Sequence, residues 1–301
     1  MSKLKYFIAL SRTPHGILDL ATPAIAALLW HGSFPSFRVV LIGMLTAFAG
    51  YTAVYAVNDL TDYRPDKKKL EKGILDDGSG DLDAVVVRHP LARGFLTYKE
   101  GLFWAIAWAI PALIGAYLLN PFCLLFFLIG CLLEISYCLL WNSSPFRSLI
   151  SGTVKTVGGL AAVFAVDPHP SPVFLILLFL WVFFWEIGGQ HLPNDWMDME
   201  EDRLVQAKTI PVVLGTTWTN FIIFPSLLLV VVLNGVLVGI SPLGKGFIPI
   251  AASLGLGIYL LLLPGYRLIR TMSRPQAAIL FNRASYYPLA VLAVISLSLV
   301  I

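Results

Sequence analysis

Two segments of the chain carry aspartates at one shared spacing, NDxxDxxxD, where x is any residue. The first runs from Asn58 to Asp66 and the second from Asn194 to Asp202. Residues three or four positions apart share one face of a helix, so each segment would present an acidic stripe, provided that Pro65 does not break the first. Clustered carboxylates repel one another unless a divalent cation neutralises them, and oxygen ligands that leave room for a phosphate favour Mg²⁺. The alternative is a solvated helix face with acids at this spacing by chance.

Basic residues follow both acidic segments, at Lys67, Lys68, Lys69, Arg88, Arg93, Arg203 and Lys208. Taken singly, such residues more often anchor a membrane protein at the lipid headgroups, and this is our interpretation of Lys68, Lys69 and Lys72. Two acidic stripes beside a basic cluster, however, indicate a polyphosphate that is bridged to the protein by metal.

The composition places these segments in a membrane protein. Of the 301 residues, 57% are apolar and 13% are charged, whereas about a quarter are charged in a typical soluble domain. The net charge of +3 is too small to suggest a nucleic-acid partner. Runs of roughly 20 apolar residues, the length of a membrane helix, are centred near residues 26, 47, 108, 131, 160, 180, 230, 255 and 294. The sequence predicts an all-α membrane protein, a single domain over residues 1–301, with nine transmembrane helices bundled around a central chamber.

The distribution of Lys and Arg predicts the orientation, because these residues are in excess on the cytoplasmic side. Of the 21, 18 fall on the side of the N-terminus, two fall on the other side, and Lys155 falls within a span. Nine spans would put the C-terminus on the opposite side. The two longest connections, about residues 58–97 and 192–217, both lie on the cytoplasmic side and contain the acidic segments, so we expect the function there, with loops and short helices capping the bundle.

Four ionisable side chains fall within predicted spans, at Asp19, Glu134, Lys155 and Glu186. Each is five to seven residues from the cytoplasmic end of its helix, which places all four roughly 8 to 11 Å below that interface. Such residues usually face a bundle interior or a water-filled cavity. We therefore expect one polar chamber beneath the acidic segments. The alternative is that Glu134 and Lys155 simply pair to stabilise helix packing.

Taken together, these motifs resemble the UbiA superfamily of intramembrane prenyltransferases. The resemblance rests on the two aspartate-rich segments, the nine spans, an RPLxxG-like segment from Arg88 to Gly94 with His89 inserted, and the run from Lys208 to Gly215. One departure is that the family's YxxxLKR-like stretch is represented only by Tyr137 and Arg147. Since acceptor contacts vary most in this superfamily, the acceptor stays open.

The resemblance implies that Mg²⁺ bridges an isoprenoid diphosphate to eight residues: Asn58, Asp59, Asp62, Asp66, Asn194, Asp195, Asp198 and Asp202. It also implies a diphosphate contact for Lys67, Arg88 and Lys208, and Arg12 is similar to the family's arginine near the first helix. We expect catalytic roles for Asp62, Asp198, Lys155 and Tyr137. The expected substrate-binding residues are Arg12, Asp19, Lys67, Arg88, Arg93, Glu134, Arg147, Glu186 and Lys208.

The predicted reaction is Mg²⁺-dependent transfer of a polyprenyl group, through an allylic cation, to an aromatic ring in quinone biosynthesis. A non-aromatic lipid or a tetrapyrrole acceptor is the alternative within the superfamily. A membrane transporter is the alternative from another class, because the acidic motif recurs after 136 residues and could mark an internal repeat. For Lys155, a contact to the diphosphate competes with a salt bridge to Glu134.

Overall fold

The computed structural model describes residues 3–74, 82, 86–243 and 246–300, and within these ranges every regular element is a helix. Eight helical stretches are long and apolar enough to cross a membrane. They are α4 (Phe37–Glu71), α5 (Tyr98–Leu119), α6 (Pro121–Leu139), α7 (Arg147–Val166), α8 (Pro172–Trp185) with η2 (Glu186–His191) and α9 (Leu192–Met197), α11 (Ile210–Ile240), α12 (Phe247–Gly257) with η3 (Ile258–Leu262) and α13 (Leu263–Thr271), and α14 (Arg274–Ser298).

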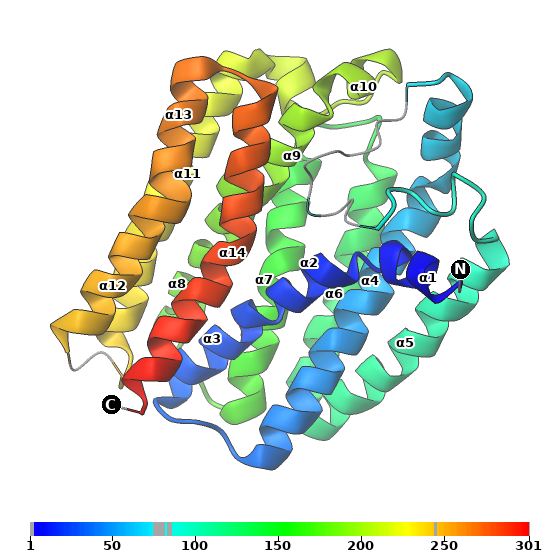
Figure 1. The fold of residues 1–301 in the computed structure, drawn as a ribbon. Coiled ribbons are helices and arrows are strands. Elements are labelled where there is room, and N and C mark those ends of the chain that lie inside the picture. The colour runs from blue at the N-terminus through cyan, green and yellow to red at the C-terminus, as the bar shows by residue number, and fades with distance from the viewer. Residues whose placement is uncertain (1–2, 75–81, 83–85, 244–245, 301) are drawn as a thin grey trace.

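The predicted count of nine spans is not confirmed, because the first apolar run does not form one long helix. It is divided into α1 (Leu4–Leu10), α2 (Thr13–Asp19) and α3 (Ala21–His31). Arg12 between α1 and α2 has a left-handed backbone, with φ of 42°. Pro14 and Pro23 occupy the first turns of α2 and α3, where a missing N–H costs little. The chain therefore enters the bundle as short, angled helices (Figure 1).

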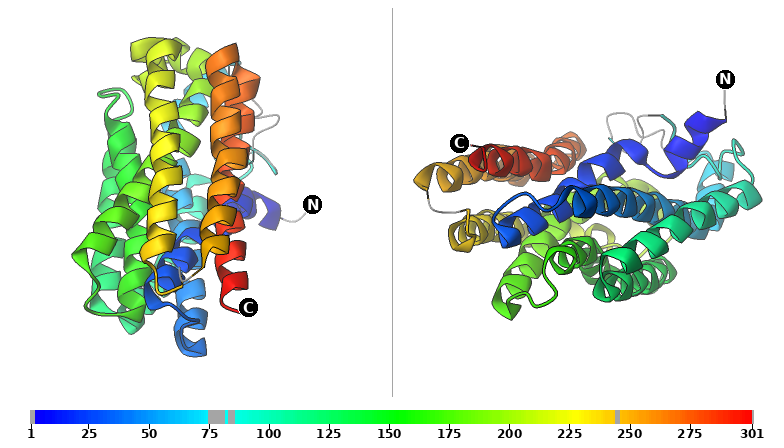
Figure 2. Two further views of the ribbon diagram at one scale, coloured as in Figure 1. Left: turned by 90° about the vertical axis from the view of Figure 1, so that its left-hand side faces the viewer. Right: turned by 90° about the horizontal axis from the view of Figure 1, so that it is seen from below.

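The long helices pack into a ring. Helix α4 packs on α5 and α6, α7 packs on α6, α3 and α8, and α11 links α8 to α12, while α14 returns to α3. The main apolar core lies between α3, α8, α11 and α14 and contains large, fully buried side chains such as Leu178, Trp181, Leu227 and Tyr287. Viewed from below, α3 and α4 lie between the C-terminal helices on one side and the green helices on the other (Figure 2).

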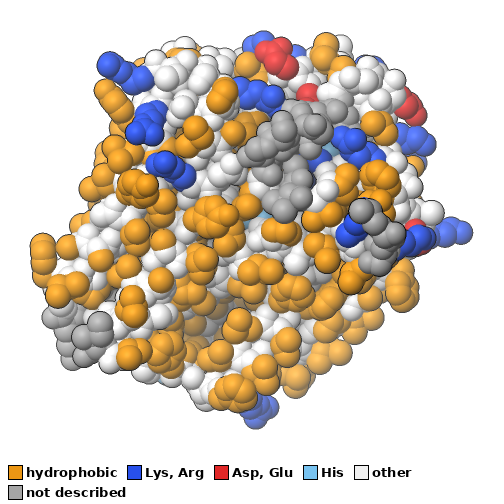
Figure 3. Space-filling model, viewed as in Figure 1, with side chains coloured by type: hydrophobic (Ala, Val, Ile, Leu, Met, Phe, Trp, Pro, Cys, Tyr) orange, Lys and Arg blue, Asp and Glu red, His pale blue; other side chains and the backbone are white. Residues whose placement is uncertain are grey.

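The outer surface is apolar over most of its height, as expected for helices in contact with lipid. Phe103 on α5 and Leu132 on α6 are 75% and 66% exposed. Charged side chains gather instead at the end of the molecule that carries α10 (Met199–Leu204) and α13, and beside the N-terminus (Figure 3). The chain is thus an integral, multi-pass membrane protein with one strongly charged end.

Candidate active site

The first acidic segment lies on a helix and not in a connecting loop, which corrects the expected boundary at residue 58. Helix α4 continues through Pro65 to Glu71, so Asp59, Asp62 and Asp66 fall on its last turns and share one face. Asp59 and Asp66 are buried. The helical stripe that the spacing predicted is therefore formed, and it is mostly enclosed although the sequence placed it in a long connection.

The second acidic segment is bent. Helix α9 ends at Met197, Asp198 has a non-helical backbone with φ of −91° and ψ of 2°, and α10 begins at Met199. The single helical stripe predicted for this segment is therefore wrong in detail. The bend still leaves Asp195, Asp198 and Asp202 on the lining of one pocket.

The two acidic segments face each other across a pocket of about 120 Å³, which we call the acidic pocket. All eight predicted metal ligands line it: Asn58, Asp59, Asp62, Asp66, Asn194, Asp195, Asp198 and Asp202. Segments separated by more than a hundred residues thus supply one constellation, as the repeated motif predicted.

Basic side chains pair with carboxylates of the acidic pocket. Arg88 Nη2 donates to Asp198 Oδ2 at 2.6 Å, and Lys69 Nζ donates to Asp202 Oδ1 at 3.3 Å. Arg147 Nη2, from the start of α7, lies 3.5 Å from Asp195 Oδ1. With Arg12, four Lys and Arg side chains line the acidic pocket, and such groups also bind phosphate oxygens.

The pKa values of Asp198 and Asp202 are shifted in opposite directions, because burial and neighbouring cations compete at each carboxyl. Burial opposes ionisation of Asp198, but the attraction and hydrogen bond of Arg88 outweigh it and lower the pKa of this carboxyl below its usual value. For Asp202, burial dominates and raises the pKa to about 6, although Lys69 opposes this shift. The Asp198 carboxylate is thus ionised at neutral pH, while ionisation of Asp202 would be favoured by a further nearby cation.

The segment that carries Arg88 is fixed by a small apolar cluster. Leu91 and Leu96 are buried against Leu60 of α4 and Ala105 of α5. Burying a leucine stabilises a fold by about 2 kcal/mol. Arg93 does not line the acidic pocket. Its Nε donates to the backbone oxygen of Arg88 at 3.0 Å. Arg93 therefore supports the segment that carries Arg88, and its predicted contact with substrate stays a prediction.

Two predicted diphosphate partners lie outside the acidic pocket. Lys67 and Lys208 are exposed and do not line it. Lys69, which we interpreted as a lipid anchor, is 8% exposed and lines it. Helical spacing explains why Lys69 and not Lys67 lines the acidic pocket. Lys69 follows Asp62 and Asp66 by seven and three residues and so shares their helix face, whereas Lys67 points away from it.

His89 is a residue of the site that the sequence analysis missed. Its Nδ1 lies 2.7 Å from Asp66 Oδ2 and 3.8 Å from Asp59 Oδ1. Ligand atoms of these three residues lie within 4.8 Å of one another, a spacing that could hold a metal ion. His89 has a left-handed backbone, with φ of 54°, which is uncommon for a side chain of this size. The one sequence feature that could have pointed to His89 is its insertion into the RPLxxG-like segment.

The residues present fit a divalent cation. Asp59 Oδ2 is buried and has no hydrogen-bond partner among the described residues, and leaving a buried carboxylate oxygen without a partner is costly. A cation bound between the carboxylates would satisfy it.

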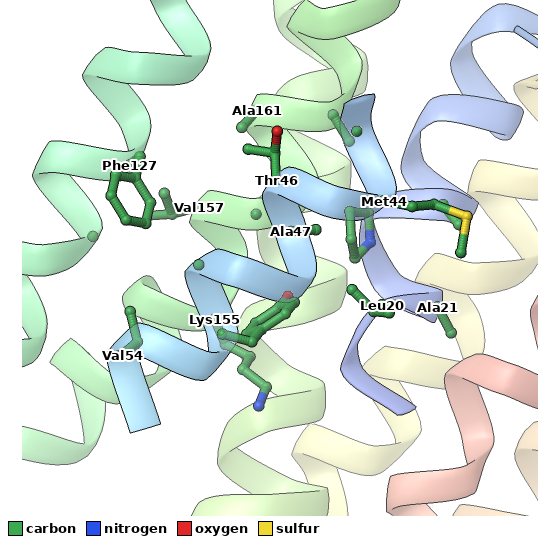
Figure 4. Close-up of a pocket in the computed structure, with 18 of the residues that line it drawn as sticks. Leu20, Ala21, Met44, Thr46, Ala47, Val54, Phe127, Lys155, Val157 and Ala161 are labelled. Carbon is green, nitrogen blue, oxygen red and sulfur yellow. The ribbon is translucent and has the colours of Figure 1, made fainter. Parts of the chain in front are cut away.

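A long apolar cavity of about 650 Å³ begins beside the acidic pocket; we call it the membrane cavity. Arg12, Asn58, Tyr137 and Asn194 line both spaces and so mark their junction. Asn58 and Val40, both on α4, line the membrane cavity, so it extends roughly 27 Å along that helix. Side chains of α4, α6 and α7, together with Leu20 and Ala21, face it (Figure 4).

The predicted polar chamber is the upper part of the membrane cavity. Glu134, Lys155 and Glu186 line it, whereas Asp19 does not line the cavity but is buried and paired with Lys155. At the junction, Arg12 donates to Asn58 Oδ1 at 3.3 Å, and Asn58 donates to Glu134 Oε1 at 2.9 Å.

Two predicted residues meet at the start of α7. The guanidinium of Arg147 lies 4.8 Å from the centre of the Tyr137 ring, so these residues form a cation–π pair at the junction.

Lys155 does not pair with Glu134, the partner that was the alternative to a diphosphate contact. Its Nζ donates to Asp19 Oδ2 at 2.7 Å and to the hydroxyl of Tyr55 at 3.1 Å. Glu134 is occupied by Asn58 instead, and Lys155 does not line the acidic pocket. The salt bridge expected with Glu134 is therefore formed with Asp19. The reason is that α2 is a short angled helix, which brings Asp19 to α7, and the sequence did not predict this.

We expect Lys155→Met to destabilise the protein by about 3 kcal/mol, because it leaves Asp19 as a buried charge without its cation. The melting temperature should fall in a thermal melt, and the double variant Asp19→Asn, Lys155→Met should recover most of the loss. A single variant that melts like the wild type would mean that the pair contributes little.

The site thus consists of an acidic pocket lined by cations and, beside it, a deep apolar cavity within an all-helical membrane bundle. The sequence model of the UbiA prenyltransferase family matches residues 20–287. The chain therefore belongs to this family and is a prenyltransferase. Membership confirms the resemblance found in the sequence and disfavours the transporter alternative.

Relatives and solved structures agree with this assignment. Over 262 residues, 87% of this chain and 83% of the relative, the chain is 22% identical to digeranylgeranylglyceryl phosphate synthase of Thermococcus kodakarensis. Among solved structures, a UbiA homologue from Aeropyrum pernix K1 matches with a TM-score of 0.71 and 18% identity, covering 94% of this chain and 97% of that one. A UbiA homologue from Archaeoglobus fulgidus bound to GPP and Mg²⁺ matches with a TM-score of 0.67 and 17% identity, covering 97% and 99%.

Proposed function

We propose that the chain transfers a prenyl group from a prenyl diphosphate to the hydroxyl of a glyceryl phosphate lipid, with Mg²⁺ as the metal. The observation that carries the donor side is the meeting of two aspartate segments with Arg88, Lys69 and Arg147 at the mouth of the membrane cavity. The acceptor is inferred from the Thermococcus kodakarensis relative, whose name states a glyceryl phosphate product. This favours the lipid acceptor over the aromatic ring that we ranked first from the sequence.

In this proposal the acidic pocket binds the metal and the diphosphate, and the membrane cavity binds the prenyl tail. Asp59, Asp62 and Asp66 from α4 and Asp195, Asp198 and Asp202 from α9 and α10 would hold the metal. Once bound, the metal would stabilise negative charge on the diphosphate as it leaves.

Arg88 and Lys69 would contact the same oxygens, and these contacts would strengthen as charge develops on them. The membrane cavity would hold the prenyl tail and exclude water from an allylic cation. By the excess of Lys and Arg at this end, we place the site and the N-terminus on the cytoplasmic side and the C-terminus on the other.

The test is a product assay with purified protein in lipid nanodiscs. Geranyl, farnesyl and geranylgeranyl diphosphates are each combined with Mg²⁺ and either a prenylglyceryl phosphate or 4-hydroxybenzoate, and products are identified by mass spectrometry. We expect a prenyl ether of the glyceryl phosphate. Transfer to the aromatic acceptor alone would overturn the proposed acceptor class and leave the donor assignment in place.

Gly43→Phe should shorten the prenyl chain that the enzyme uses. Gly43 lines the membrane cavity, and a Cβ added there meets nothing within 4 Å, so the new ring can enter the space. Overfilling a packed site costs about 1–3 kcal/mol, which is a loss of about 5- to 150-fold in kcat/KM for geranylgeranyl relative to geranyl diphosphate.

The matched control is Gly255→Phe. Gly255 also has open space around its Cβ position but lies outside the membrane cavity, and its chain-length preference should equal that of the wild type. If Gly43→Phe left this preference unchanged, the prenyl tail would not occupy the membrane cavity at this depth.

A further inference from the structure

Glu186 is a buried carboxylate with one free oxygen inside the membrane cavity. It is 7% exposed. Its Oε1 accepts a hydrogen bond from Ser151 Oγ of α7 at 3.0 Å. Its Oε2 is buried without a hydrogen-bond partner among the described residues. An unpartnered carboxylate oxygen is costly to bury, so it is expected to have a partner in the working enzyme.

The position of Glu186 is fixed by the local backbone. It is the first residue of η2, a π-helical segment between α8 and α9, and such segments occur often at functional sites. Gly188 and Gly189 let this segment pack tightly, since a Cβ at these positions would lie 2.8 Å from Ser226 and 2.9 Å from Ala284. The segment is therefore locked against α11 and α14, with Glu186 directed to the cavity.

The neighbouring groups favour a hydrogen-bond donor as the missing partner. Lys155 is already paired with Asp19 at 2.7 Å, and Asp19 also accepts from Tyr55. Arg12, the other Lys or Arg side chain described as lining this cavity, donates to Asn58 at the junction. With Glu134 and Glu186 lining the same space, an anionic group would meet carboxylates there. A neutral hydroxyl group, by contrast, can donate to Glu186 Oε2 without adding charge.

The position also suits the reaction. Glu186 precedes Asn194 by eight residues, so it lies about 10 Å below the junction with the acidic pocket. The reacting end of a prenyl diphosphate held in the acidic pocket would enter the membrane cavity at that junction. An acceptor placed between the two could then face the prenyl group on one side and Glu186 on the other.

We propose that Glu186 is the proton acceptor for the nucleophile, and that the acceptor is therefore a molecule with a hydroxyl group at its reacting end. The inference rests on the proposed function as far as the prenyl diphosphate donor is concerned. The bond between C1 of the prenyl group and the diphosphate oxygen breaks, and its electron pair leaves with the diphosphate. A lone pair of the acceptor oxygen forms the new bond to C1, and the hydroxyl proton passes to Glu186 Oε2.

The experiment compares Glu186→Gln with the wild type in two assays. The first measures transfer of the prenyl group to the hydroxyl of a prenylglyceryl phosphate. A wild type that prenylates only the ring of 4-hydroxybenzoate would overturn the proposal. The second measures Mg²⁺-dependent release of diphosphate without any acceptor. Glutamine keeps the size of the side chain and can still accept from Ser151. We expect transfer to fall by about a hundredfold or more, the usual effect of a lost general base, and acceptor-free diphosphate release to stay within about twofold.

Two controls separate chemistry from structure. Ser151→Ala removes the partner of Glu186 but keeps the carboxylate, so it should lower transfer by less than about tenfold. A thiol analogue of the acceptor gives up its proton more readily than the hydroxyl, so Glu186→Gln should impair its transfer less. Retained transfer in Glu186→Gln, or an equal loss in both assays, would overturn the proposal. Absence of diphosphate release in the wild type would instead contradict the donor assignment.

Discussion

Asp62→Ala is expected to lower prenyl transfer by more than a hundredfold, since even partners of metal ligands cost about 10- to 100-fold when removed. Asp62 lines the acidic pocket from α4. Removing one carboxylate from a crowded cluster relieves repulsion, so the metal-free variant should melt at the wild-type temperature or above. The stabilisation that Mg²⁺ gives the wild type should disappear. Product assays and thermal melts with and without Mg²⁺ measure both effects.

Asp198→Ala should lose the same activity but should also free Arg88 from its 2.6 Å contact. Glu200→Ala is the matched control, because this exposed acid lies in the same segment and contacts Arg203, and its activity should not change. A folded Asp62→Ala variant with near-normal turnover would contradict the metal assignment.

Lys69→Met is expected to lower turnover by about a hundredfold, the usual loss when one preorganised donor to a developing negative charge is removed. Lys69 is buried in the acidic pocket, 3.3 Å from Asp202 and 3.7 Å from Glu201. Lys67→Met is the comparison, because this exposed neighbour does not line the pocket and its loss should change kcat and KM less than about twofold. Equal effects of the two substitutions, in steady-state kinetics with the prenyl diphosphate varied, would show that Lys69 acts only through general charge.

The aspartate constellation could be predicted from sequence because it depends on spacing alone. Asp59, Asp62 and Asp66 lie on consecutive turns of one helix, and their counterparts follow the same rule closely enough to reach the pocket despite the bend at Asp198. The same spacing places Lys69, but not Lys67, on the helix face of Asp62 and Asp66. We missed this because we interpreted Lys69 as a lipid anchor.

Contacts between distant helices could not be predicted in the same way. Lys155 pairs with Asp19 because α2 and α3 are short and angled, and no local pattern reports that angle. The extension of α4 through Pro65 depends on packing that outweighs the missing backbone hydrogen bond. His89 reaches Asp66 only because the segment after it is anchored by Leu91.

The central claim is that two distant aspartate segments form one metal and diphosphate site. It is tested most directly by determining the structure of the protein with Mn²⁺ and a prenyl thiolodiphosphate, which resists ionisation, and locating the metal by anomalous scattering. We predict metal between the carboxylates of α4 and those of α9 and α10, the diphosphate beside Arg88 and Lys69, and the prenyl tail in the membrane cavity. Metal bound by only one of the two segments, or a diphosphate outside the acidic pocket, would contradict the claim.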